Sequence, residues 1–157
     1  MKRLIVYDTK HGCTAEVVEE MRRHWAGEPT VILLKQADIP DLEGFDQVIV
    51  GGSIHAGQIQ KSVKQFCETH RDRLLSKPLG LFLCCMDDEK GQAQFESAFD
   101  VMLRNHATAT GVLGGAFDFE KMNRIERFIV KKVAGATATV KRLDEDAIAR
   151  FAETMNI

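Results

Sequence analysis

Six consecutive residues near the N-terminus combine hydroxyl, cationic and glycine groups in a pattern suited to binding an anion. The segment 9–14 reads TKHGCT and separates an apolar run, LIVY at 4–7, from a helix-like pattern. Backbone N–H groups at a helix N-terminus lack intrahelical partners and carry partial positive charge, so they attract phosphate. The hydroxyls of Thr9 and Thr14 would add donors, and Gly12 would let the backbone approach a ligand closely. The alternative is a simple strand-to-helix turn in which the threonines only cap the helix.

Other motifs that would give this segment a different chemistry are missing. Neither G-x-x-x-x-G-K-[ST] nor G-x-G-x-x-G occurs there, so neither a Walker loop nor a dinucleotide fingerprint is predicted. The histidines are scattered without an H-E-x-x-H motif, and no C-x-x-C pair occurs among Cys13, Cys67, Cys84 and Cys85. We therefore expect free thiols and no metal site.

Length and composition predict one ordinary globular domain over residues 1–157. The chain is 45% hydrophobic and 28% charged, with a formal net charge of −2, values typical of a domain with a full core. This charge provides no general attraction to nucleic acid. No uninterrupted apolar stretch of about eighteen residues occurs, and the apolar run after MKR is too short for a signal peptide. We expect a cytoplasmic protein.

Apolar strand-like runs alternate with amphipathic helical patterns along the chain. Strands are expected at 3–7, 30–34, 46–53, 79–85 and near 110–117, and helical patterns at 15–25, 60–75, 95–103, 121–133 and after Asp144. The first, third and fourth strands are continuously apolar, which is typical of strands buried on both faces of a parallel sheet. The alternation predicts a doubly wound α/β fold, in which ligands bind beyond the carboxyl ends of the strands. The candidate loops are therefore 8–14, 52–60 and 84–91.

The whole chain resembles the flavodoxin family. TKHGCT is similar to that family's phosphate loop, T/S-x-x-G-x-T/S after the first strand. Within the superfamily, three segments resemble the menaquinone-dependent protoporphyrinogen oxidases and their short flavodoxin-domain relatives: VIVGGSIHAGQIQKSVKQF at 48–66, RLLSKPLGLFLCC at 73–85, and FEKMNRIERFIVKKVAGATATVKRLDEDAIARFA at 119–152. The resemblance implies a flavodoxin-like three-layer sandwich around a five-stranded parallel sheet of order 2-1-3-4-5. It also implies an FMN cofactor, a protoporphyrinogen-type substrate and a quinone or other redox partner.

By that resemblance, three loops would surround the FMN. The phosphate is expected against the first loop, with Thr9 and Thr14 as its main donors, beside Lys10, His11, Gly12 and Cys13. The isoalloxazine is expected between two groups: Ser53, Ile54, His55, Ala56 and Gly57 on one side, and Cys85, Met86, Asp87, Asp88 and Glu89 on the other. His55 is also the candidate catalytic residue, because an imidazolium would stabilise an anionic reduced flavin. The alternative is a solvated loop histidine.

The ring end of this expected site departs from the family pattern. The related oxidases tend to have an arginine followed by an aromatic residue where this chain has His55 and Ala56. Trp25 and Tyr7 belong to the first helix and the first strand, so neither flavin loop contains an aromatic side chain. The absence of one aromatic stacking interaction costs roughly 1 kcal/mol of binding free energy, or about tenfold in affinity. Either FMN binds weakly, or the open face of the ring accepts a flat substrate.

Several side chains have a structural and a functional interpretation. Cys13 is expected to be a small residue beside the phosphate, with a reactive thiol as the alternative. Cys84 and Cys85 alternate faces on a strand, so at least one should pack in the core, and His70 should pack on an apolar helix face. The acidic tip 87–89 is interpreted as a solvated helix start, with a proton donor as the alternative.

The basic pattern at 121–133 and the low net charge bear on the choice between functions. This helix is expected to pack on the sheet, although a basic amphipathic helix can also lie on the inner membrane surface, where a quinone would be reached. Flavodoxin electron carriers are usually strongly acidic, so a net charge of −2 disfavours a simple carrier. Three functions stay open: an FMN-dependent oxidoreductase, a small electron-transfer flavodoxin, and a binding module that has lost the flavin.

Overall fold

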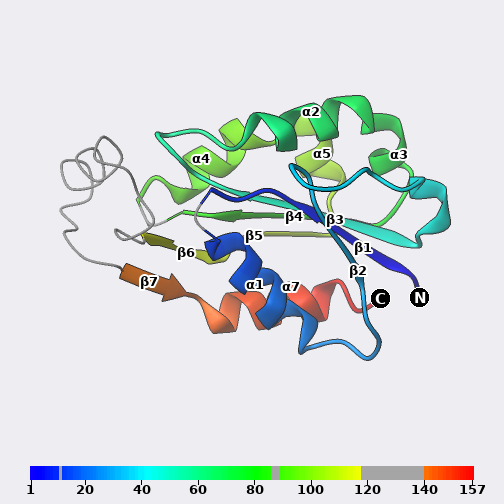
Figure 1. Cartoon of the computed structure of the whole chain (residues 1–157), viewed down its shortest axis with the longest axis horizontal. Coiled ribbons are helices and arrows are strands. Elements are labelled where there is room, and N and C mark those ends of the chain that lie inside the picture. Colours follow the sequence, from blue (N-terminus) through cyan, green and yellow to red (C-terminus); the bar gives the residue numbers. More distant parts are fainter. Residues whose placement is uncertain (11, 86–88, 118–139) are drawn as a thin grey trace.

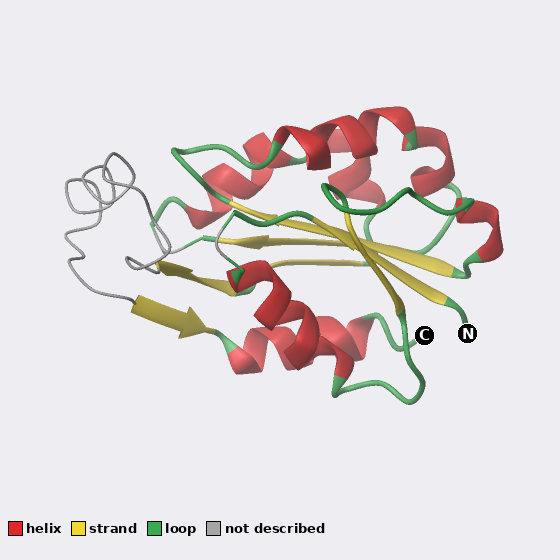
Figure 2. Ribbon diagram, viewed as in Figure 1, coloured by secondary structure: helices red, strands yellow, loops and turns green. Residues whose placement is uncertain are grey.

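The computed structural model describes residues 1–10, 12–85, 89–117 and 140–157. In these ranges a twisted sheet is covered by helices on both faces, which gives three layers (Figures 1 and 2). The sheet has five strands in the order β2-β1-β3-β4-β5, and every neighbouring pair is parallel. The strands are β1 (Arg3–Tyr7), β2 (Thr30–Leu33), β3 (Gln47–Ser53), β4 (Leu79–Cys84) and β5 (Ala109–Val112). The predicted sheet and its strand order are confirmed.

Helices are divided between the two faces of the sheet (Figure 1). One face carries α2 (Lys61–Thr69), α3 (Arg71–Leu75), α4 (Gly91–Ala98) and α5 (Val101–His106), and the other carries α1 (Cys13–Arg22) and α7 (Glu145–Thr154). A short 3-10 helix, η1 (Leu42–Gly44), precedes β3. Asp144 caps α7, as predicted, because its carboxylate accepts a hydrogen bond from the Ala147 N–H at 2.9 Å. Among the helices of the described ranges, none combines the length and apolarity needed to cross a bilayer.

The three central strands are buried on both faces. Every residue of β1, β3 and β4 is buried, which confirms the interpretation of their continuous apolar runs. Alternate side chains serve two separate cores, as the period of two requires. In β1, Leu4 and Val6 contribute to the core under α2–α5, whereas Ile5 and Tyr7 contribute to the core under α1 and α7. The sheet is thus a buried layer whose edges alone can carry polar chemistry.

The prediction of a single strand near 110–117 is wrong. The structure ends β5 at Val112 and starts a second strand, β6 (Gly114–Phe117), which pairs antiparallel with β7 (Val140–Leu143) in a separate two-stranded sheet. Gly114 has a φ of +103°, a conformation open to glycine, so the chain can leave the parallel sheet there. The signal that could have indicated this bend is the pair Gly114-Gly115 inside the apolar run.

Two predicted helical patterns are each divided in the structure. His70 separates α2 from α3, and its ring lies half-buried with its centroid 4.8 Å from that of Phe66. Phe99 is extended between α4 and α5, so the pattern at 95–103 does not form one helix, and Met102 is 51% exposed. The basic pattern 121–133 lies outside the described residues.

Gly51 provides a test of the packing between β3 and β4. A Cβ at this position would lie 2.1 Å from the ring of Phe82, which is fully buried on the neighbouring strand. We expect Gly51→Ala to lower the free energy of unfolding by about 2–3 kcal/mol, measured by urea denaturation, because a packed core cannot absorb the overlap. Gly44→Ala is the matched control, because nothing lies within 4 Å of its Cβ position. Equal stabilities of the two variants would contradict this packing.

Candidate functional site

The loops after β1, β3 and β4 meet at one edge of the sheet. Tyr7 is in register with Gly51, and Ser53 is in register with Cys84, so the three strands end side by side. Backbone hydrogen bonds continue past the strand ends, with the Asp8 N–H donating to Gly51 O at 3.3 Å and the Ile54 N–H to Cys84 O at 2.9 Å. The structure therefore brings together the loops that the sequence selected.

Gly12 shapes the first loop and begins α1. It is the N-cap residue, with a left-handed φ of +87°, and no side chain caps the first turn of α1 among the described residues. The Gly12 N–H donates to Thr9 Oγ1 at 3.1 Å, so the Thr9 hydroxyl closes the loop on itself. Because Gly12 has no side chain that could cap the first turn of α1, this helix end is suited to an external anion.

The Thr14 side chain lies at the same helix end. It is fully buried, and its Oγ1 has no hydrogen-bond partner of good geometry within the described chain, although the Cys84 thiol is nearby. A buried hydroxyl without a partner is unfavourable and is rare in folded proteins. A phosphate oxygen at the start of α1 would supply an acceptor for it. The residues present therefore fit a phosphate group.

Lys10 connects the first loop to the loop after β3. Its Nζ lies 3.1 Å from His55 Nε2, although 45 residues separate the two in sequence. The ammonium can only donate, so a hydrogen bond between these two atoms requires Nε2 to accept, which is the tautomer with the ring proton on Nδ1. An imidazolium at His55 would lose this bond and repel the ammonium.

The loop after β3 is a tight turn with a fixed base. His55 and Gln58 exchange backbone hydrogen bonds of 2.8 and 3.1 Å, and the two residues between them have positive φ, 49° at Ala56 and 78° at Gly57. This is the geometry of a two-residue hairpin turn, and both central residues are exposed. Ile54, just before the turn, is half-buried against the core under α2–α5.

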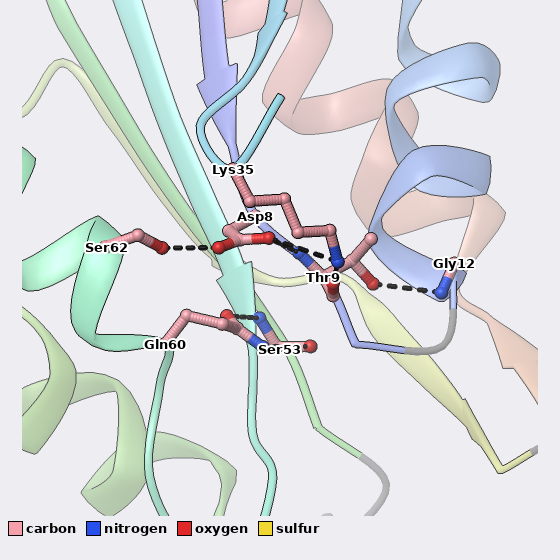
Figure 3. Close-up of polar contacts among 7 residues, drawn as sticks. All are labelled: Asp8, Thr9, Gly12, Lys35, Ser53, Gln60 and Ser62. Atoms are coloured by element: carbon pink, nitrogen blue, oxygen red, sulfur yellow. Dashed lines mark hydrogen bonds and ion pairs between the residues drawn. The ribbon is translucent and has the colours of Figure 1, made fainter. Parts of the chain in front are cut away.

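Gln60 holds the buried Ser53 at the base of this turn (Figure 3). Its Oε1 accepts from the Ser53 N–H at 3.0 Å, and its Nε2 donates to Ser53 Oγ at 2.9 Å. The two contacts fix both the backbone and the hydroxyl of Ser53. Sequence reasoning missed Gln60, because a glutamine seven residues further along the chain carries no pattern that would indicate such a clamp.

Among the residues 85–89, which are expected on the second side of the flavin ring, the structure describes Cys85 and Glu89. Cys85 is buried, its N–H donates to Gly114 O at 2.7 Å and its thiol donates to Gln94 Oε1, while Glu89 is exposed. A hollow of about 430 Å³ lies beside Cys85 and is lined further by Val112, Gly114, Leu143, Asp144, Glu145 and Asp146. Its acidic wall does not suit a phosphate. Four other expected site residues lie outside the described ranges: His11, Met86, Asp87 and Asp88.

The two aromatic residues that the sequence singled out are both in the core. Tyr7 is buried under α1, and burial raises the pKa of its phenol. Trp25 is buried with its indole N–H donating to Ala152 O at 2.8 Å and the Arg3 guanidinium 4.1 Å from its ring centroid. Their structural roles are therefore in packing and not in ligand stacking.

A polar network under the first loop was also missed (Figure 3). The buried Asp8 carboxylate accepts from the Thr9 N–H at 2.7 Å and from the hydroxyl of Ser62 on α2. Lys35, which follows β2, places its Nζ 3.5 Å from Asp8 Oδ1 and also donates to Thr9 O. The available signal was position, since Asp8 and Lys35 follow neighbouring parallel strands and so reach the same edge.

A doubly wound sheet of order 2-1-3-4-5, with a glycine N-cap at the helix after its first strand, defines a flavodoxin-like protein. The chain belongs to the flavodoxin domain family, whose model matches residues 4–144. Membership in this family implies a flavin cofactor. Within the described ranges, no group of three or more histidine, cysteine and acidic side chains could hold a metal ion.

One relative and two solved structures illustrate the similarity. The chain is 26% identical to protoporphyrinogen IX dehydrogenase (quinone) of Escherichia coli strain K12 over 168 residues, which cover 97% of this chain and 93% of the relative. A short-chain flavodoxin associated with a bacterial microcompartment superposes with a TM-score of 0.59 at 15% identity, over 98% of this chain and 96% of the other. Megasphaera elsdenii flavodoxin gives 0.58 at 14% identity, over 96% and 98%. These two structures support the fold alone.

The four cysteines provide a test of the burial around the site. All are free and buried, which favours packing over a reactive Cys13. Burial raises the pKa of the Cys67 thiol to about 12, and a hydrogen bond with Cys13 together with burial raises the pKa of Cys84. We expect the native thiols to react with Ellman's reagent at about pH 8 at least about 100-fold more slowly than those of the denatured chain, because the reagent reaches buried thiols only when the structure opens. In denaturant all four should react, whereas one rapidly reacting thiol in the native protein would contradict the expectation.

Proposed function

We propose that this chain binds FMN, with the phosphate at the N-terminus of α1. The observation that carries the proposal is the start of α1 at Gly12, which has no side chain to cap it, beside the buried Thr14 Oγ1, which has no hydrogen-bond partner of good geometry among the described residues. Thr9 closes the loop through Gly12 and holds its shape. The remaining residues proposed around the phosphate are Lys10, His11, Gly12 and Cys13.

We place the isoalloxazine against the turn after β3. Ser53, Ile54, His55, Ala56 and Gly57 would lie along one side of the ring, and Cys85, Met86, Asp87, Asp88 and Glu89 along the other. Lys10 and His55 come from the two ends of this proposed site, and their 3.1 Å contact spans the gap between the loops. His55 is the proposed residue for interaction with the ring, and Gln60 fixes the strand end before it through Ser53.

The proposed activity is an oxidoreductase of the protoporphyrinogen type with a quinone acceptor. FMN, when bound, would supply the chemistry by taking electrons from the reduced substrate and passing them to the quinone. The support is the similarity to protoporphyrinogen IX dehydrogenase (quinone) over nearly the full length of both chains. The lack of aromatic side chains in the 53–57 loop would leave a ring face open to a flat substrate.

A second candidate function is electron transfer without a small-molecule substrate. Its support is that the flavodoxin domain family model matches residues 4–144, nearly the whole chain. The two functions differ in one assay with the FMN-loaded protein, namely menaquinone-linked oxidation of protoporphyrinogen. Turnover supports the oxidase, whereas no turnover with intact flavin supports the carrier.

Replacing Thr14 tests the proposed phosphate site. Thr14→Val keeps the buried volume but removes the hydroxyl, so we expect FMN to bind about tenfold more weakly, the loss typical of one hydrogen bond to a charged group. The measurement is a titration of the apoprotein into FMN, followed by quenching of flavin fluorescence. Thr30→Val is the control, because Thr30 is exposed and lies at the start of β2, whereas the proposed site lies beyond the carboxyl ends of the strands.

The outcomes separate the parts of the proposal. Unchanged FMN affinity in Thr14→Val, with Thr30→Val also unchanged, would remove Thr14 from the phosphate site. If the unaltered chain does not bind FMN at high micromolar concentration, both flavin functions are contradicted. The third function, a binding module that has lost the flavin, would then be supported.

A further inference from the structure

A buried negative charge lies directly beneath the proposed phosphate loop. Asp8 is 6% exposed and immediately precedes Thr9, whose N–H it accepts at 2.7 Å. A carboxylate in this position repels an anion that binds to the same loop, and low exposure limits screening by solvent. It also occupies the Thr9 amide, which is therefore withdrawn from the donors available to a phosphate. Taken alone, Asp8 opposes the binding of FMN.

Lys35 supplies the opposing charge. Its Nζ lies 3.5 Å from Asp8 Oδ1 and donates to Thr9 O, so one ammonium contacts both the carboxylate and the backbone of the loop (Figure 3). The side chain of Lys35 is 46% exposed whereas that of Asp8 is 8% exposed, so the lysine reaches the carboxylate from the solvent side. Ser62 also binds Asp8, but a hydroxyl contributes no net charge.

We propose that Lys35 is a positioning residue that makes the loop selective for flavins carrying a phosphate. It neutralises Asp8, and it holds the Thr9 carbonyl so that the Thr9 hydroxyl faces Gly12 and the first turn of α1. This inference rests on the proposed function, since it concerns the same phosphate site. It assigns a preference for FMN over riboflavin, which has the same ring system and no phosphate, to two charges outside the segment 9–14.

A purely structural role for Lys35 predicts a different pattern. If Lys35 only tied the end of β2 to the end of β1, its removal would weaken FMN and riboflavin equally, through a general loosening of the site. If it acts through charge, the loss is confined to the ligand with the phosphate. The loss is then also relieved when the Asp8 charge is removed together with that of Lys35.

The experiment measures dissociation constants for FMN and riboflavin by quenching of flavin fluorescence. We expect Lys35→Met to weaken FMN about tenfold, equivalent to about 1.4 kcal/mol, and to change riboflavin by less than about twofold. Lys35→Arg should retain the preference for FMN, because the guanidinium keeps the charge. The double variant Asp8→Asn with Lys35→Met should recover most of the FMN affinity, because no uncompensated carboxylate is left.

Lys77→Met is the matched control. Lys77 also donates to a backbone carbonyl, Phe45 O at 2.9 Å, but it precedes β4 and so lies at the opposite edge of the sheet. It therefore reproduces the change in net charge and the loss of a carbonyl hydrogen bond away from the loop, and both flavins should bind to it as before. Urea denaturation of every variant checks that each is folded under the binding conditions.

Each outcome decides a separate question. Equal weakening of FMN and riboflavin by Lys35→Met, or an unchanged ratio of their affinities, overturns the role of Lys35 while the proposed function stands. A double variant as weak as Lys35→Met overturns the charge compensation by Lys35. If the unaltered chain binds neither flavin, the proposed function and this inference both fail.

Discussion

Burial of β1, β3 and β4 on both faces is the constraint on which the rest of the structure depends. Because every residue of these strands is buried, their polar side chains lie at the strand ends, as Ser53 does, and most of the polar chemistry falls to the residues that follow them. The parallel register then aligns those residues, with Tyr7 beside Gly51 and Ser53 beside Cys84. Gly51 contributes in a second way, since its missing side chain leaves space for the Phe82 ring. The location of the candidate site is thus a consequence of sheet packing and not of the loops themselves.

The same edge balances opposing electrostatic features. The start of α1 carries the positive end of the helix dipole and has no side-chain cap among the described residues, while the Asp8 carboxylate is buried one residue before the loop. Lys35 contacts Asp8, and Lys10, within the loop, contacts His55 in the turn after β3. An anion at this edge would therefore meet a field set by several groups, of which only the helix end is visible in a sequence motif.

Sequence reasoning succeeded where the signal is local and failed where it depends on contacts between distant segments. The boundaries of β1 and the cap at Asp144 follow from neighbouring residues, and both were predicted. The Asp8–Ser62 contact joins residues 54 apart, and its formation depends on how α2 packs against the end of β1. A serine on a helix and a lysine after a strand are ordinary surface residues by type. No periodicity distinguishes them from solvated neighbours.

The break between β5 and β6 and the division of the helices have a related cause. Hydrophobic periodicity reports which residues are buried, but not where the backbone turns between buried residues. Leu113 is buried, yet the chain leaves the sheet at the next residue because Gly114 adopts a positive φ. Likewise Phe99 is buried in an extended conformation, so an apolar spacing that fits one long helix is shared by α4 and α5. Burial was therefore predicted more reliably than element boundaries.

The distribution of aromatic side chains determines which end of the proposed flavin site must provide the affinity. Tyr7 and Trp25 are committed to the core, and the 53–57 turn carries no aromatic residue that could stack on a ring. Without stacking from this turn, more of the binding free energy of FMN would come from the phosphate end, where a helix terminus and charged groups act over short distances. Such a site would select ligands that carry a phosphate, and changes in the ring would alter the affinity little. The ring face would then stay accessible, and an electron donor or acceptor could approach it without displacing a side chain. The lack of aromatic residues in the 53–57 turn would therefore account both for weak binding of the ring and for its access to redox partners.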